Sequence, residues 1–101
     1  MSASGKNILE NVKQNHQVFL NYLKAKFPVF HNSNIFFRDL QYGLKGFFEM
    51  MNQSLSYPEA EELAKEIGNY FEQKGIFIRV NNLGWKLNYP EFVTTAPGDP
   101  L

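Results

Sequence analysis

Residues 56–89 contain the pattern that most constrains the fold, because signals for the start and end of one helix are followed at once by signals for a hairpin. Ser56 and Glu59 have the S-x-x-E spacing of a capping box, and Pro58 falls in the first turn, where a missing N–H costs little. Apolar residues then recur at helical spacing, at Ala60, Leu63, Ala64, Ile67 and Phe71. Gly75 supplies the left-handed residue at which such helices end. The sequence therefore predicts a capped amphipathic helix between Ser56 and Gly75.

The segment after Gly75 has the pattern of a strand, a turn and a second strand. If residues 81–84 form a four-residue loop, Val80 pairs with Trp85 and Ile78 pairs with Leu87. Period-2 alternation then places one apolar set on the core face, namely Ile76, Ile78, Val80, Trp85, Leu87 and Tyr89. The opposite face receives Phe77, Arg79, Lys86 and Asn88. We therefore expect Trp85 to be buried, and Arg79 and Lys86 to be exposed.

A long helix is also predicted at the start of the chain, over residues 6–26. Its apolar stripe is Ile8, Val12, Phe19 and Leu23. Pro28 ends it, since proline cannot continue a helix. The connector that follows has Val29 and Phe30 as candidates for a short strand at the edge of the hairpin.

The middle of the chain, roughly residues 35–52, predicts the most apolar helix. It begins after residues 32–34, whose Asn and Ser side chains all suit an N-cap. At 100° per residue its apolar side chains cover an arc of about 160°, which fits a central helix that touches two or more neighbours. Phe37 and Phe48 lie at the edge of this arc. If the rest of the domain does not cover them, they form an exposed apolar patch of the kind that marks an interface.

Composition favours one compact domain. The chain has 101 residues, a formal net charge of zero and 44% hydrophobic residues. There is no cysteine, so neither disulfides nor thiolate metal sites are available. No apolar run approaches the length of a membrane span, and the polar start does not read as a signal peptide, so a cytoplasmic location is the expectation. We assign residues 6–92 to the domain and expect residues 1–5 and 93–101 to be disordered ends.

The arrangement of three helices followed by a hairpin resembles the winged-helix class, and within it the DEP domain. There, a helix of the form s-x-x-E-A-x-x-L-g-x-x-L-x-x-x-G-x-I precedes a hairpin whose second strand ends in an aromatic residue. The matching positions here are Ser56, Glu59, Ala60, Leu63, Phe71, Gly75, Ile76, Tyr89 and Phe92. The resemblance covers residues 56–92. It implies an α+β fold: a winged-helix-like three-helix domain with a C-terminal two-stranded β-hairpin as its wing.

No pattern in the sequence indicates catalysis, a metal site or a bound cofactor. Glu62 and Glu66 share a helical face, but no Glu-x-x-His motif completes a dinuclear metal site. His16 and His31 have no carboxylates at ligand spacing, and no serine lies in a G-x-S-x-G elbow. We therefore expect a protein that is not an enzyme and that has no catalytic, cofactor-binding or metal-binding residues.

Two classes of function remain open. A winged helix suggests DNA binding, with Arg79 and Lys86 of the wing as the candidate nucleic-acid contacts. However, residues 57–75 carry five Glu against Lys65 and Lys74, and such a helix is repelled by phosphates. The favoured hypothesis is a non-catalytic protein–protein interaction module whose partner is unknown or is a second copy of the chain. Its candidate interface residues are Phe37, Phe48 and Phe77, and a DNA-binding transcription regulator is the alternative.

Overall fold

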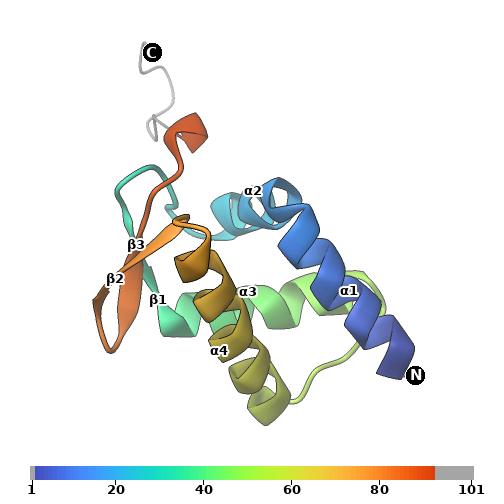
Figure 1. Ribbon diagram of the computed structural model, residues 1–101. Helices are drawn as coiled ribbons and strands as arrows, with labels where there is room; N and C mark the ends of the chain where they lie inside the picture. The colour runs from blue at the N-terminus through green and yellow to red at the C-terminus, as the bar shows by residue number, and fades with distance from the viewer. Residues whose placement is uncertain (1, 93–101) are drawn as a thin grey trace.

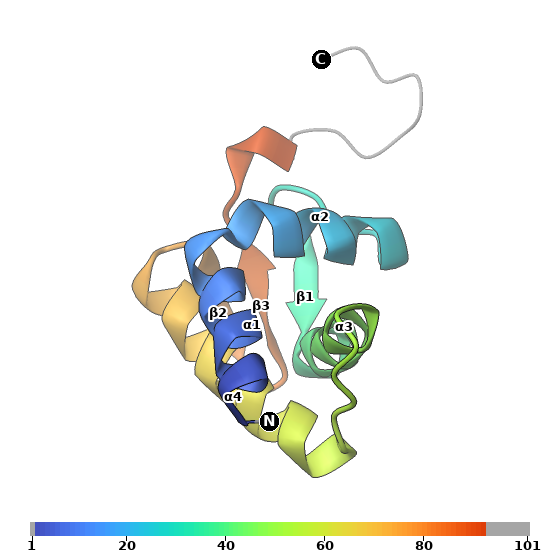
Figure 2. The same cartoon turned by 90° about the vertical axis from the view of Figure 1, so that its right-hand side faces the viewer.

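The computed structural model describes residues 2–92, with side chains from Ile8 onward, and shows an α+β fold. Within these residues, four α-helices lie on one side of a three-stranded antiparallel sheet (Figures 1 and 2). The elements are α1 (Ser2–Gln14), α2 (His16–Lys26), β1 (Asn34–Phe36), α3 (Phe37–Met50), α4 (Tyr57–Gln73), β2 (Phe77–Asn81), β3 (Gly84–Leu87) and the short 3₁₀ helix η1 (Pro90–Phe92). Helix α1 begins at Ser2, so it includes residues 2–5, which we expected to be a disordered end. The predicted disorder of Met1 and of residues 93–101 falls outside the described residues.

The single helix predicted over residues 6–26 is two helices. They are separated at Asn15, whose backbone angles (φ −115°, ψ 55°) are not helical. Asparagine has a low helix propensity because its side chain competes for local hydrogen bonds, and here the Asn15 amide donates to the Asn11 side-chain oxygen over 2.8 Å. The break changes the direction of the chain, and Lys13 at the end of α1 forms an ion pair with Glu66 of α4 over 2.8 Å.

The sheet has three strands, not two, and its third strand comes from an unexpected place. The strand order is β1-β3-β2, so β3 lies in the centre. Strand β1 occupies Asn34–Phe36, where we predicted the start of a helix, and the predicted edge strand at Val29 and Phe30 is not a strand. Asn32, with φ 72°, turns the connector into β1. Helix α3 then starts at Phe37, and the Asp39 carboxylate accepts from the Phe36 N–H over 3.4 Å.

Helix α4 begins and ends as predicted. Ser56 and Glu59 form both bonds of a capping box: the Glu59 carboxylate accepts from the Ser56 N–H and the Ser56 hydroxyl accepts from the Glu59 N–H. At the other end Gly75 has φ 77°. The Ile76 N–H donates to the Phe71 carbonyl over 2.9 Å and the Gly75 N–H to the Glu72 carbonyl over 3.0 Å, which is the Schellman pattern.

The hairpin follows α4 as predicted, but the register that we predicted for it is wrong by one residue. Phe77 pairs with Leu87 and Arg79 pairs with Trp85. The register shifts between Arg79 and Asn81, so Val80 is the extra residue of a β-bulge. Burial of Trp85 and exposure of Arg79 and Lys86 are confirmed. For β2 the faces are exchanged: Phe77 is in the core, whereas Ile78 and Val80, which we predicted to be buried, are 51% and 55% exposed.

Gly84 explains much of this register. We assigned it to the loop, but it is the first residue of β3 and pairs with Phe36 of β1. A Cβ atom at this position would meet the Ile35 carbonyl oxygen, so only glycine lets β1 approach so closely. With Gly84 in the sheet and paired with Asn81, the turn contains only two residues, and the extra residue is accommodated in the bulge.

Candidate functional site

The structure separates the three candidate interface residues. Phe48 and Phe77 are each 1% exposed and belong to the core, so their assignment to a partner interface is wrong. Phe48 lies on the buried face of α3. Phe77 is turned inward by the register, and its ring centroid lies 5.0 Å from those of both Phe71 and Trp85. Phe37 is half-buried beside Trp85 and keeps some contact with the surface.

The wing arginine is engaged within the domain. One carboxylate oxygen of Glu72 on α4 accepts from Arg79 Nε over 3.1 Å, from Arg79 Nη2 over 2.6 Å and from the Trp85 indole N–H over 3.0 Å. The Arg79 guanidinium also lies 5.3 Å from the Trp85 ring. Hydrogen bonds from Arg79 and then Trp85 hold the pKa of Glu72 below its ordinary value. Glu72 therefore ties both strands of the hairpin to α4.

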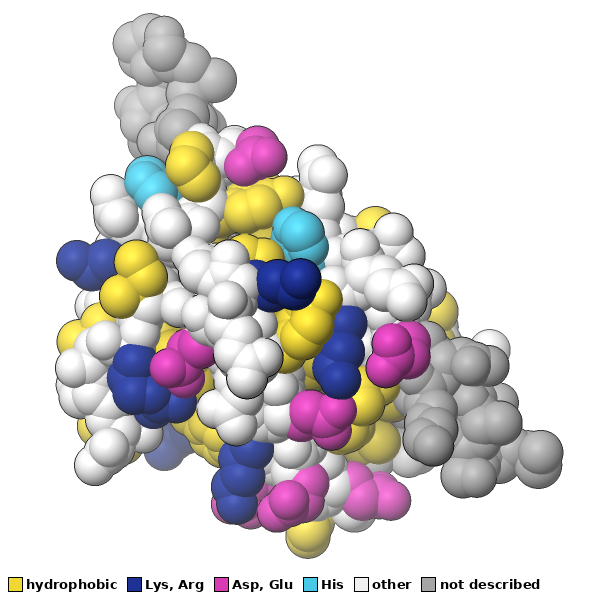
Figure 3. Space-filling model, in the orientation of Figure 1, with side chains coloured by type: hydrophobic (Ala, Val, Ile, Leu, Met, Phe, Trp, Pro, Cys, Tyr) yellow, Lys and Arg dark blue, Asp and Glu magenta, His cyan; other side chains and the backbone are white. Residues whose placement is uncertain are grey.

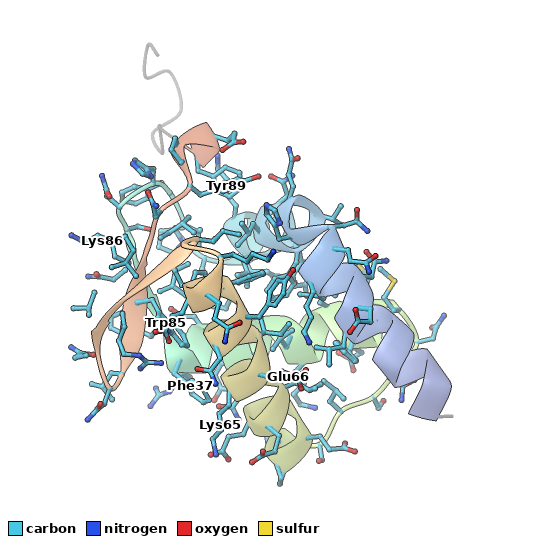
Figure 4. All side chains as sticks on the ribbon, viewed as in Figure 1. Phe37, Lys65, Glu66, Trp85, Lys86 and Tyr89 are labelled. Carbon is cyan, nitrogen blue, oxygen red and sulfur yellow. The ribbon has the colours of Figure 1, made fainter. Side chains whose placement is uncertain are left out.

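The second basic residue of the wing, Lys86, lies on the opposite face of the sheet. It is the central residue of a row in which Asn34 of β1 and Ile78 of β2 are its neighbours. Figure 4 shows it pointing away from the helices, whereas Trp85 lies toward α4. Lys86 is exposed and forms no ion pair with any residue from 8 to 92. Arg79 and Lys86 are therefore not one basic patch.

The face of the sheet that carries Lys86 also carries exposed apolar side chains. The helices lie on the other side of the sheet (Figure 1), and yellow side chains appear along the left margin of Figure 3, where the sheet lies. Four large apolar residues belong to this surface or to the adjoining turn: Phe36 (51% exposed), Ile78 (51%), Val80 (55%) and Leu83 (69%). We call this the outer sheet face. The sequence pattern did not indicate it, because the alternation in β2 predicted Ile78 and Val80 on the core face.

A small hollow of about 70 Å³ lies within the outer sheet face. Phe36 of β1 and Val80 of β2 are among its lining residues, and Gly84 lies between these two strands. Asn34 of β1 and Asn81 of β2 also line it, so its walls are both apolar and polar. Its volume exceeds the roughly 10–15 Å³ that one water molecule needs, but it is far below the about 300–1,000 Å³ of a small-molecule site.

Two larger, open hollows lie on the other side of the hairpin turn. One, of about 390 Å³, lies between α4 and the hairpin and is lined by Phe37, Glu61, Lys65, Asn69, Arg79, Asn82 and Trp85. The other, of about 620 Å³, lies at the start of α3 and shares Phe37 and Glu61 with the first. In the first hollow, Lys65 pairs with Glu61 and Glu62, and Arg79 pairs with Glu72. The second hollow has Arg38, Asp39 and Glu61 in its lining. Both hollows therefore carry charges of both signs.

The exposed part of α4 is acidic, as the sequence indicated. Magenta side chains gather over the lower part of Figure 3, where α4 lies. Among residues 8–92 no group of three or more His, Asp and Glu side chains is placed to hold a metal ion. Over the same part of the chain, no helix is both long and apolar enough to cross a membrane. No protein-family model matches the chain, and neither a curated protein nor a solved structure matches it.

Proposed function

We propose that this chain is a non-catalytic, winged-helix-like module that binds another protein through its outer sheet face. The observation that carries the proposal is the set of exposed apolar side chains on a sheet face that no helix of residues 2–92 covers: Phe36, Ile78 and Val80, with Leu83 at the turn. Single exposed apolar residues are ordinary, but several on the two outer strands and the turn of one sheet are typical of interaction surfaces.

The order of the elements supports the winged-helix part of the proposal. The strand β1 lies between helices α2 and α3, and α4 leads directly into the β2–β3 hairpin. The hairpin's second strand pairs with β1, which gives the order β1-β3-β2. In this description α2, α3 and α4 are the three helices of the class, the hairpin is the wing and α1 is an addition at the start. The narrower DEP-like resemblance stays a prediction.

Charge favours a protein over DNA as the partner. A helix that enters the major groove needs basic or polar side chains, whereas the exposed side of α4 carries Glu61, Glu62 and Glu66. Arg79 is already paired with Glu72, which leaves Lys86 as the one wing cation available to phosphates. One phosphate contact gives little affinity at physiological salt.

A position-specific crosslink tests the proposal. A photo-crosslinking amino acid replaces Ile78 on the outer sheet face, and a control chain carries it at Val18, which is 53% exposed on α2. In native cells we expect discrete protein adducts with the first chain and not with the second. The adducts should disappear when Val80→Glu is added, and the purified chain should not retard a mixed-sequence duplex at about 150 mM salt. The proposal is wrong if the crosslinker at position 78 forms no discrete protein adduct or if it forms adducts with nucleic acid. It is also wrong if the protein adducts are unchanged by Val80→Glu.

A further inference from the structure

The outer sheet face has a chemistry that narrows the class of partner. We infer that it takes an extended protein segment in which an aliphatic residue and an acidic residue are two positions apart. This inference rests on the proposed function and specifies the partner's contact sequence. The aliphatic side chain would occupy the hollow above Gly84, and the carboxylate would pair with Lys86.

The hollow argues for an aliphatic side chain. Its walls include Phe36 and Val80, one from each neighbour of β3, with the polar Asn34 and Asn81 beside them, and its volume of about 70 Å³ suits part of a side chain rather than a whole ligand. Filling it removes apolar surface from water on both partners, which is favourable. A Cβ atom on Gly84 would meet the backbone of β1, so glycine at this position lets β1 and β3 pair closely beside the hollow.

Lys86 argues for the carboxylate. Among the described residues it is the only charged side chain on the outer sheet face, and it has no acidic partner there. Covering the face with a purely apolar partner would remove this ammonium group from water without compensation, which is unfavourable. An acidic residue in the partner offsets that cost and gives a charge-assisted hydrogen bond.

The spacing follows from strand geometry. Gly84 and Lys86 are two residues apart on β3, so their positions on this face are separated by roughly 7 Å. In an extended partner, residues i and i+2 point to the same side with the same separation. A segment that runs along β3 therefore reaches the hollow and Lys86 with two side chains that are two positions apart.

A second copy of the chain fits this face less well. In a two-fold dimer the same patch meets itself, so an interface between two outer sheet faces would enclose two Lys86 side chains. Among residues 8–92 the face has no acidic side chain to separate the two ammonium groups. Like charges brought together in an interface are destabilising.

A random peptide library tests the inference with the purified full chain. Twelve-residue peptides are displayed on phage, selected on the chain, and the enriched sequences are compared. We expect enrichment of an aliphatic residue followed or preceded at two positions by Asp or Glu. Affinities of one enriched synthetic peptide, measured by fluorescence polarisation, then give the effect of each variant.

Variants on the face and matched controls separate a specific site from general stickiness. Val80→Glu should weaken binding by about tenfold or more, because it places a carboxylate in the wall of the hollow. Lys86→Glu should weaken it by about fivefold or more, and a peptide whose acidic residue is changed to Lys should recover the loss. The controls are Val18→Glu and Lys26→Glu, which make the same changes at exposed positions of α2 and should alter the affinity less than about twofold.

The other results overturn the inference in distinguishable ways. The inference fails if the enriched peptides are basic or share no common pattern. It also fails if they bind the Val80→Glu variant as tightly as the unchanged chain, because the face then does not take such a segment. Sedimentation of the purified chain as a dimer that Val80→Glu dissociates would show that the face takes a second copy. Either result contradicts the inference and leaves the protein-binding proposal standing. If the crosslinker at position 78 gives no protein adduct that Val80→Glu abolishes, both the inference and the protein-binding proposal are contradicted.

Discussion

The carboxylate of Glu72 should contribute more to stability than any other acidic side chain of α4, because it joins the helix to both strands of the hairpin. Glu72→Ala removes the acceptor of the Trp85 indole N–H. Trp85 is only 3% exposed, so water cannot readily replace that acceptor, and an unsatisfied buried donor costs about 1–3 kcal/mol. The Arg79 ion pair is partly exposed, with side chains 43% and 28% accessible, and adds about 0.5–1 kcal/mol. Together these losses predict a decrease in unfolding free energy of about 1.5–4 kcal/mol.

Two further variants resolve these contributions. Glu72→Gln keeps a neutral acceptor for the indole but removes the charge, so we expect a loss of only about 0.5–1 kcal/mol. Glu62→Ala is the control, because the Glu62 side chain is 75% exposed and should matter by less than about 0.5 kcal/mol. Equilibrium unfolding in urea at pH 7 is the assay. The chain has a single tryptophan, so its fluorescence reports on this site directly.

The pH dependence follows from the lowered pKa of Glu72. A carboxyl group with a lower pKa in the folded chain adds stability that is full above its unfolded pKa and is lost as the pH falls through the folded value. The ordinary value is 4.5, so the gap between wild type and Glu72→Ala should be constant near neutrality and should narrow below about pH 4.5. A Glu72→Ala loss no larger than that of Glu62→Ala, or a gap that does not narrow at all in acid, would refute this account.

Substitutions at four other positions test particular features of the fold in the same urea assay. Phe77→Ala should cost about 3–5 kcal/mol and Ile78→Ala less than about 0.5 kcal/mol, and the reverse order would restore the register expected from the sequence. Gly75→Ala should cost about 1 kcal/mol purely through its φ of 77°, since nothing lies within 4 Å of an added Cβ; an unchanged urea midpoint would contradict that conformation. His31→Ala should cost about 1 kcal/mol because His31 Nδ1 accepts from the Tyr89 N–H over 3.0 Å, and His31→Asn, which retains an acceptor, should recover part of the loss.

The parts of the fold that local sequence determines were predictable. The limits of α4 depend on Ser56, Glu59 and Gly75, each of which acts on backbone groups within a few residues. The orientation of β3 was also predictable, because Trp85 and Leu87 have no equally apolar neighbours that could replace them in the core. A local signal suffices where no competing arrangement satisfies the same residues.

The features that sequence did not predict depend on distant contacts. Strand β1 exists because β3 offers a partner to Asn34–Phe36, and nothing within those three residues requires a strand. The alternation in β2 favours the wrong face, because Ile76, Ile78 and Val80 form one apolar set against Phe77 alone in the other. Burial of Phe77 between Phe71 and Trp85, together with the pairing of Gly84 with β1, decides it. The outer sheet face was missed for the same reason, since the expected register places Ile78 and Val80 in the core.

The one-residue difference in register has consequences on both faces of the sheet. On the inner face it brings Arg79 opposite Trp85 and within reach of Glu72, so the arginine that would serve a nucleic-acid-binding wing is held by an ion pair. On the outer face it leaves Ile78 and Val80 beside Lys86 and places the bulge residue next to the hollow above Gly84. In the register expected from the sequence, those two side chains would be buried and Arg79 would share a face with Lys86. The pairing that removes a basic wing therefore also creates the apolar surface, and on this ground we propose a protein segment and not DNA as the partner.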